Sequence, residues 1–400
     1  MSKAFFKAGH FPTLAVCFLY FDLSFAVWVL LAPLAVLIAD DLHLQPDQKG
    51  LMVATPVLAG ALLRVLNGVL IGQWKARRVG VAMQLVVIAG LLLAWRLGLN
   101  SFGQVLALGM VLGVAGASFA IALPMVSYWY PPERQGVVLG LTGAGNSGTV
   151  FAALFAPALA LAIDWRNVLG LAALPLLAVL LAFVLFARDS PHSPPPKTLA
   201  DYRRVLRTPD AWWLMFFYGI SFGGFVGLSS FLPIYFNDQY GLSAVTAGYF
   251  TAGCVFVGSF VRPLGGALAD RIGGTRALAM VYAFVALMLT IITVGHQSAF
   301  GALAALALAM TALGMGNGAV FQLVPQRFRS DVGLLTGLVG MSGGVGGFCL
   351  AAGLGYVRQF TGDYACGFGG FALLALLAWG GIASVRLRWR GTAALGGVRV

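Results

Sequence analysis

The amino-acid sequence predicts an all-α membrane protein with twelve transmembrane helices in two pseudo-symmetric six-helix bundles. Of its 400 residues, 60% are hydrophobic and only 10% are charged, and the mean hydropathy is +0.90. A soluble domain has about 25% charged residues. The composition therefore excludes a soluble enzyme, a disordered chain and an ordinary nucleic-acid-binding protein. Two further observations, twelve separate apolar runs and an internal repeat, predict the number of helices and their division into halves.

Each expected span holds the roughly 20 mostly apolar residues that a helix needs to cross about 30 Å of hydrocarbon. Most connections between the spans are short, but the segment after the sixth span is rich in proline and charge and separates two halves. The twelve expected spans are 12–38, 50–72, 79–98, 102–127, 135–160, 166–187, 211–236, 245–269, 277–295, 299–324, 332–357 and 365–386.

The basic residues predict the orientation, because cytoplasmic loops of membrane proteins carry an excess of Lys and Arg. With the N-terminus in the cytoplasm, nineteen Lys and Arg lie on that side and four on the other. We therefore expect a multi-pass protein of the bacterial inner membrane with both termini cytoplasmic. The expected segments are an N-terminal bundle 1–187, a cytoplasmic linker 188–210, a C-terminal bundle 211–386 and a cytoplasmic tail 387–400.

The two halves repeat each other. Arg64 lies inside the second span, and Arg262 follows 198 residues later inside the eighth. Gly143 in the fifth span and Gly340 in the eleventh are 197 residues apart. Two parallel six-span repeats are typical of alternating-access transporters, which bind their substrate near the midplane between the repeats.

Arg64 and Arg262 are the most informative residues, because a charge at the bilayer centre costs at least about 2.5–3.5 kcal/mol unless something compensates for it. Asp22 is the one carboxylate within a span, so two cations face at most one acid. A guanidinium group stays charged and presents a fork of donors that matches an oxyanion. We expect an anion to complete the site. The alternative is that each arginine is structural and either snorkels toward the membrane surface or bonds to backbone carbonyls.

The fifth and eleventh spans carry glycines at helical spacing, which leave a smooth stripe where a neighbouring helix can approach closely. Tight packing alone would explain such a stripe. Asn146 interrupts it, and its amide could donate to a bound oxyanion or bond to another helix. Gly143 and Gly340 are expected to line the site, and the glycines expected to allow conformational change are Gly140, Gly337, Gly343 and Gly344.

These segments resemble the nitrate/nitrite porter family of the major facilitator superfamily, over nearly the whole chain. The resemblance rests on Gly143-Ala-Gly-Asn146-Ser-Gly148, on Gly337 to Phe348, on the segments around Arg64 and Arg262, and on Gly314 to Pro325. It implies that Arg64 and Arg262 clamp the anion, that Asn146 hydrogen-bonds it, and that aromatic rings sandwich it. By local match those rings are Phe119, Tyr218 and Phe222, although aromatic residues also pack in spans for other reasons.

The superfamily also carries a basic loop motif after the second and eighth spans. The second copy looks intact, with Asp270 and Arg271, whereas the first runs from Gly72 to Arg78 without an acid. The resemblance therefore implies a cytoplasmic Asp–Arg latch around Asp270 that stabilises one state of the carrier.

An empty site with two fixed cations is costly to close, and a bound anion offsets that cost. This favours exchange of nitrate for nitrite. Proton symport through Asp22, transport of a larger anion such as a phosphate ester, and a receptor or channel for anions are the alternatives. We expect a monomer whose partners are a small inorganic oxyanion and the lipid bilayer, with no nucleic acid, cofactor, metal site or enzymatic activity.

Overall fold

The computed structural model describes residues 9–131, 138, 141–191, 198–294, 297–328 and 331–393. These residues form long helices, and twelve of the helical segments are long and apolar enough to cross a membrane. The prediction of an all-α protein with twelve spans is therefore confirmed. The fifth span is described from Leu141 onward, so its expected beginning, including Gly140, lies outside the described residues.

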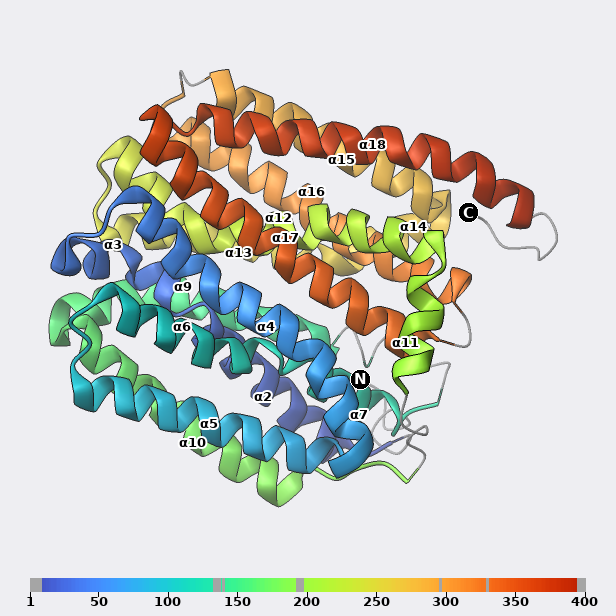
Figure 1. The fold of residues 1–400 in the computed structure, drawn as a ribbon, viewed down its shortest axis with the longest axis horizontal. Helices are drawn as coiled ribbons and strands as arrows, with labels where there is room; N and C mark the ends of the chain where they lie inside the picture. Colours follow the sequence, from blue (N-terminus) through green and yellow to red (C-terminus); the bar gives the residue numbers. More distant parts are fainter. Residues whose placement is uncertain are drawn as a thin grey trace.

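The N-terminal half contains spans that are continuous and spans that change direction part-way. In Figure 1 its outer helices lie along one edge of the molecule, opposite the outer helices of the C-terminal half. Its helices are α2 (Phe11–Trp28), α3 (Leu31–Leu42), α4 (Pro46–Trp74), α5 (Ala76–Leu97), α6 (Phe102–Gly116), α7 (Phe119–Ser127), the 3-10 turn η1 (Ala144–Ser147), α9 (Gly148–Ile163) and α10 (Trp165–Phe186).

The C-terminal half follows a short amphipathic helix, α11 (Leu199–Leu206), which lies at the same end of the molecule as the last turns of α18 (Figure 1). We call this the linker end, and we call the opposite end, where α3 finishes, the distal end. The remaining helices are α12 (Pro209–Tyr240), α13 (Ala244–Phe260), α14 (Arg262–Ile272), α15 (Gly274–Val294), α16 (Ala299–Arg327), α17 (Val332–Thr361) and α18 (Ala365–Ala393).

Helix boundaries follow from local chemistry. Proline occupies the first turn of α4 and α12, where no amide partner is needed. Gly98 and Gly241 end α5 and α12 with φ of 68° and 64°, a left-handed conformation that a side chain would disfavour.

Four spans are interrupted part-way along their length. The first bends at Val29–Leu30, because Pro33 has no N–H to donate to the carbonyl of Val29. The eighth bends at Val261, next to Pro263. The fourth bends between α6 and α7, and the fifth passes through η1. Interrupted helices near the midplane are a feature of transporter binding sites.

Helix α17 packs closely between α4 and α12 along its glycines. A Cβ atom on Gly346 would lie 2.2 Å from the carbonyl oxygen of Gly219 on α12. A Cβ atom on Gly355 would lie 2.8 Å from the Cα of Gly50 on α4. Because a real Cβ does not come this close, these glycines allow the two halves to meet along α17.

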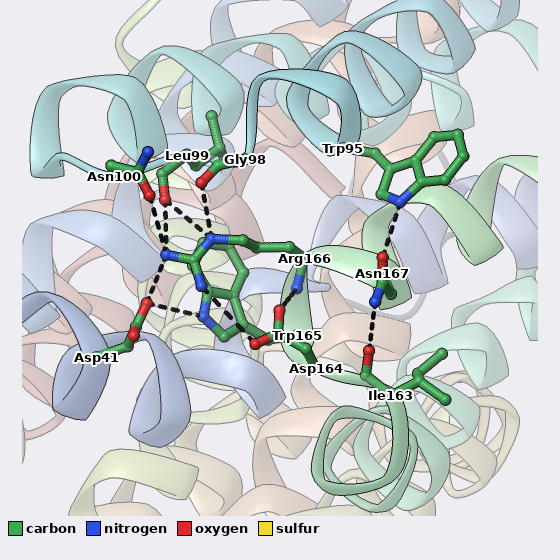
Figure 2. Close-up of polar contacts among 10 residues, drawn as sticks. All are labelled: Asp41, Trp95, Gly98, Leu99, Asn100, Ile163, Asp164, Trp165, Arg166 and Asn167. Carbon is green, nitrogen blue, oxygen red and sulfur yellow. Dashed lines mark hydrogen bonds and ion pairs between the residues drawn. The ribbon is translucent and has the colours of Figure 1, made fainter.

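Hydrogen bonds of Arg166 connect three separate segments of the N-terminal half at the distal end (Figure 2). Its Nη2 donates to Oδ2 of Asp41 at 2.6 Å and to the carbonyl of Leu99 at 3.0 Å, and its Nε donates to the carbonyl of Gly98 at 2.7 Å. Asp164 also lies 3.7 Å from its guanidinium group. The arginine thus joins the end of α3, the turn after α5 and the start of α10.

Candidate substrate-binding site

Arg64 lies in the interior of the molecule, on α4, with a relative exposure of 3%. Its Nη1 donates to the carbonyl oxygen of Gly340 on α17 at 2.7 Å. Its Nε and Nη2 both donate to the carbonyl oxygen of Gly116 at 3.3 Å. Gly116 is the last residue of α6, where the interruption of the fourth span frees its carbonyl. These bonds use three of the five N–H groups of the guanidinium.

Aromatic rings surround the Arg64 guanidinium. Its Cζ lies 5.4 Å from the ring centroid of Trp28, 5.6 Å from that of Phe119 and 5.4 Å from that of Phe222. These distances fall within the range in which ring faces attract a cation. The first ring is held in place because Trp28 Nε1 donates to the carbonyl oxygen of Pro56 at 2.7 Å.

Arg262 begins α14 and is partly buried. Its Nη2 donates to the hydroxyl of Tyr218 at 3.1 Å, and its Cζ lies 5.6 Å from the ring centroid of Phe321. Tyr218 stacks on Phe222, with centroids 5.1 Å apart and ring planes 3° from parallel. The stacked rings on α12 therefore contact both arginines, Arg262 through Tyr218 and Arg64 through Phe222.

Neither arginine is balanced by an acid in the described part of the chain. The partners of Arg64 are neutral carbonyl oxygens and rings, and the partners of Arg262 are a neutral hydroxyl and a ring. The ion pairs of the described residues involve other basic residues, such as Lys49, Arg166 and Arg327. Two positive charges therefore remain near the stacked rings, and an anion is the chemical species that they are suited to bind.

Asn146 lies on η1, with a relative exposure of 4%, and its Oδ1 is buried without a hydrogen-bond partner in the part of the chain that the structure describes. The turn packs against α2: a Cβ atom on Gly145 would lie 2.4 Å from the ring of Phe21. Phe21 in turn contacts Phe119, with ring centroids 5.7 Å apart. Asn146 therefore lies on an element that contacts the aromatic surroundings of Arg64 through Phe21.

The expected glycines differ in what surrounds them. A Cβ atom on Gly340 would lie 3.6 Å from Nη1 of Arg64, which is ordinary contact. A Cβ atom on Gly343 would lie 2.8 Å from the rings of both Tyr218 and Phe222, and one on Gly344 would lie 2.5 Å from Ala61. At Gly143 and Gly337, no atom from other segments of the described residues lies within 4 Å of such a Cβ. The structure thus brings Gly340 and Gly343 to the arginines and rings.

The expected gating pair Asp270–Arg271 lies at the end of α14, where both side chains are exposed. Within the described ranges no ion pair involves Asp270. An ion pair between the two halves lies at the distal end, where Lys49 Nζ is 3.0 Å from Oδ1 of Asp238. The hydroxyl of Tyr364, in the same half as Asp238, donates to Oδ2 of Asp238 at 2.9 Å.

Sequence reasoning did not identify Trp28, Phe321, Lys49 or Asp238. Phe321 belongs to the segment Gly314 to Pro325 that carries the family resemblance, so its motif was visible although its contact with Arg262 was not. The Lys49–Asp238 pair joins residues 189 positions apart, and no spacing in the sequence indicates such a contact.

Comparisons with known proteins agree with this architecture. The family model described as Major Facilitator Superfamily matches residues 16–351. A bacterial homolog to the human lysosomal transporter Spinster, solved in an inward-facing and unoccupied conformation, superposes with a TM-score of 0.69. That superposition covers 96% of this chain and 97% of the other at 20% identity, and so it supports the fold.

Related sequences indicate the branch of the superfamily to which the chain belongs. The "Nitrite extrusion protein" of Bacillus subtilis is 34% identical over 89% of both chains. The "Probable nitrate/nitrite transporter NarK2" of Mycobacterium tuberculosis is 34% identical over 81% of this chain and 83% of its own. The "Probable nitrate/nitrite antiporter NarK1" of Thermus thermophilus is 31% identical over 86% and 84%. This chain therefore belongs to the Major Facilitator Superfamily and, within it, to the nitrate/nitrite porters.

Proposed function

We propose that this protein carries nitrate and nitrite across the bacterial inner membrane by alternating access, exchanging one anion for the other. The observation that supports this most is the pair Arg64 and Arg262. Arg64 lies near the ring of Phe222, Arg262 donates to the hydroxyl of Tyr218, these two rings stack on each other, and the described partners of both arginines are neutral. The names of relatives at 31–34% identity point to the same substrates.

The planar ion lies between the guanidinium groups and accepts from the N–H groups that protein oxygens leave unused. Arg64 and Arg262 supply most of these donors, and the amide of Asn146 supplies another. Phe119, Tyr218 and Phe222 face the ion as an apolar wall, while Gly143 and Gly340 keep the backbone close to it. A small, flat ion suits this site better than a phosphate ester does, because the surroundings offer rings and glycines rather than further polar groups.

Alternating access then takes the form of the bundles 1–187 and 211–386 rocking about this site, connected by the linker 188–210. Gly140, Gly337, Gly343 and Gly344 permit the helix movements. The linker end lies in the cytoplasm, as the excess of basic residues indicates. The contact between Lys49 and Asp238 then closes the periplasmic side.

The electrostatic cost of closing the empty site favours exchange of one anion for another. Closing the empty site on both sides would take two cations away from water without compensation, which is costly in a low-dielectric interior. A bound nitrate or nitrite offsets part of that charge, so the loaded carrier rearranges more readily than the empty one. A proton-coupled mode is the second candidate, and Asp22 favours it as a buried carboxylate in the first span.

Uptake of labelled nitrate by proteoliposomes that contain the purified protein tests the proposal. We expect rapid uptake when the vesicles hold nitrite and no pH gradient is applied, and little uptake when they hold no counter-anion. Nitrite should compete with the label, whereas phosphate and glycerol phosphate should not. Uptake that requires a pH gradient but no internal anion would replace exchange by symport, and competition by glycerol phosphate would overturn the choice of substrate.

A further inference from the structure

A buried carboxylate contacts the interruption of the fifth span. Asp22 on α2 has a relative exposure of 6%. Ser147 Oγ, on η1, donates to Oδ1 of Asp22 at 2.6 Å. The proposed exchange mechanism assigns no role to Asp22. This residue directly follows Phe21 and lies three residues before Phe25 in the first span.

The backbone of η1 approaches α2 as closely as glycine permits. A Cβ atom on Gly148 would lie 1.8 Å from the carbonyl oxygen of Asp22, and one on Gly145 would lie 2.4 Å from the ring of Phe21. Because Gly145 and Gly148 bring no side chains to this contact, Ser147 supplies the side-chain hydrogen bond between η1 and α2 in the described residues. A hydrogen bond to a charged oxygen is short, strong and directional. The bond from Ser147 therefore fixes the position of the turn along α2.

Asn146 immediately precedes Ser147 on this turn. In a 3-10 turn successive side chains point about 120° apart around the axis of the turn. A rotation of the turn that moves Ser147 therefore also changes the direction of the Asn146 side chain. Among the described residues, the Oδ1 atom of Asn146 has no hydrogen-bond partner that would hold it in place. The orientation of its amide consequently depends on the contact between Ser147 and Asp22.

We propose that Asp22 is a positioning residue for substrate binding: it accepts a hydrogen bond from Ser147 and thereby holds the amide of Asn146 toward the bound oxyanion. This inference rests on the proposed function. It assigns Asp22 the role of a hydrogen-bond acceptor rather than a proton carrier. Asparagine, which keeps an acceptor oxygen, should therefore replace it, whereas alanine should not.

The test compares nitrate uptake kinetics of purified variants in nitrite-loaded proteoliposomes. We expect Asp22→Ala and Ser147→Ala each to raise KM for nitrate by about tenfold, the effect of losing one charge-assisted hydrogen bond. The maximal rate per reconstituted transporter should stay within about twofold. Asp22→Asn should behave like the wild-type protein. Ser24→Ala is the matched control, because Ser24 is also a buried hydroxyl on α2 but donates to Oε1 of Gln84.

A second comparison separates positioning from general support of the fold. If Asp22 acts through Asn146, adding Asp22→Ala to Asn146→Ala should not raise KM beyond the value for Asn146→Ala alone. Full additivity in this cycle would overturn the inference. A wild-type KM in Ser147→Ala would also overturn it, and this variant can be measured even if Asp22→Ala does not fold. A loss of activity in Asp22→Asn equal to that in Asp22→Ala would overturn it as well. A wild-type protein that carries no nitrate would overturn the proposed function and this inference with it.

Discussion

Arg64 on α4 and Gly340 on α17 are joined by a hydrogen bond of 2.7 Å between Nη1 and the carbonyl oxygen. This bond connects the two halves of the molecule at the level of the candidate site. Arg64, which we propose to bind the substrate, is therefore also a contact between the two halves. We expect an oxyanion that accepts from the remaining N–H groups of Arg64 to draw the guanidinium toward itself and weaken this contact, so that substrate binding favours the rearrangement of the halves.

The glycines of α17 give a prediction about packing. Gly343→Ala should slow nitrate exchange by at least about tenfold, because its Cβ would lie 2.8 Å from the rings of Tyr218 and Phe222 and would displace them. Gly353→Ala is the matched control on the same helix, since no atom of the neighbouring described residues lies within 4 Å of its Cβ. Exchange by the two variants in proteoliposomes checks this, and equal rates would contradict the assigned role of Gly343.

The distal contact between the halves gives a second prediction. Lys49→Gln removes the partner of Asp238, whose side chain is only 14% exposed, and should loosen the meeting of α4 with α12. Backbone amides at the start of α4 should then exchange with deuterium faster than in the wild-type protein, while those of α15 should not change. The double variant Lys49→Asp with Asp238→Lys should restore slow exchange. Unchanged exchange in Lys49→Gln would show that this ion pair does not hold the distal end closed.

A third prediction concerns stability. Arg166→Ala leaves Asp41 and the carbonyls of Gly98 and Leu99 without their shared donor. A loss of about 1–3 kcal/mol is the usual cost of such unpaired groups, and a shift of a few degrees in melting temperature follows. Arg96→Ala, which removes an exposed arginine from the end of α5, should leave the melting temperature unchanged. A similar drop in both variants would mean that net charge, rather than this contact, is responsible.

The spans and the paired arginines could be predicted because their signals are local or repeated. A run of apolar residues predicts a helix wherever it occurs, and a cation inside such a run is conspicuous. The bends at Pro33 and Pro263 also have a visible cause. The bend at Ala117–Ser118 has none in the sequence, since Pro124 lies further along α7.

The details of the candidate site could not be predicted, because they depend on how helices are rotated against each other. The sequence does not show that the ring of Trp28, rather than that of Phe25, lies over Arg64. It predicts that Gly340 lines the site, but it does not show that Arg64 is the side chain that Gly340 contacts. Residue type shows that a helix can be approached closely, and the tertiary structure determines where the neighbour lies.

Nitrate binding to purified Arg64→Lys and Arg262→Lys, measured by calorimetry beside the wild-type protein, tests most directly whether the unbalanced arginines hold the anion. Lysine keeps the positive charge but loses the planar fork of donors. Each variant should therefore bind nitrate at least about tenfold more weakly. Affinity close to that of the wild-type protein in both variants would contradict the assignment of these two residues as the anion clamp.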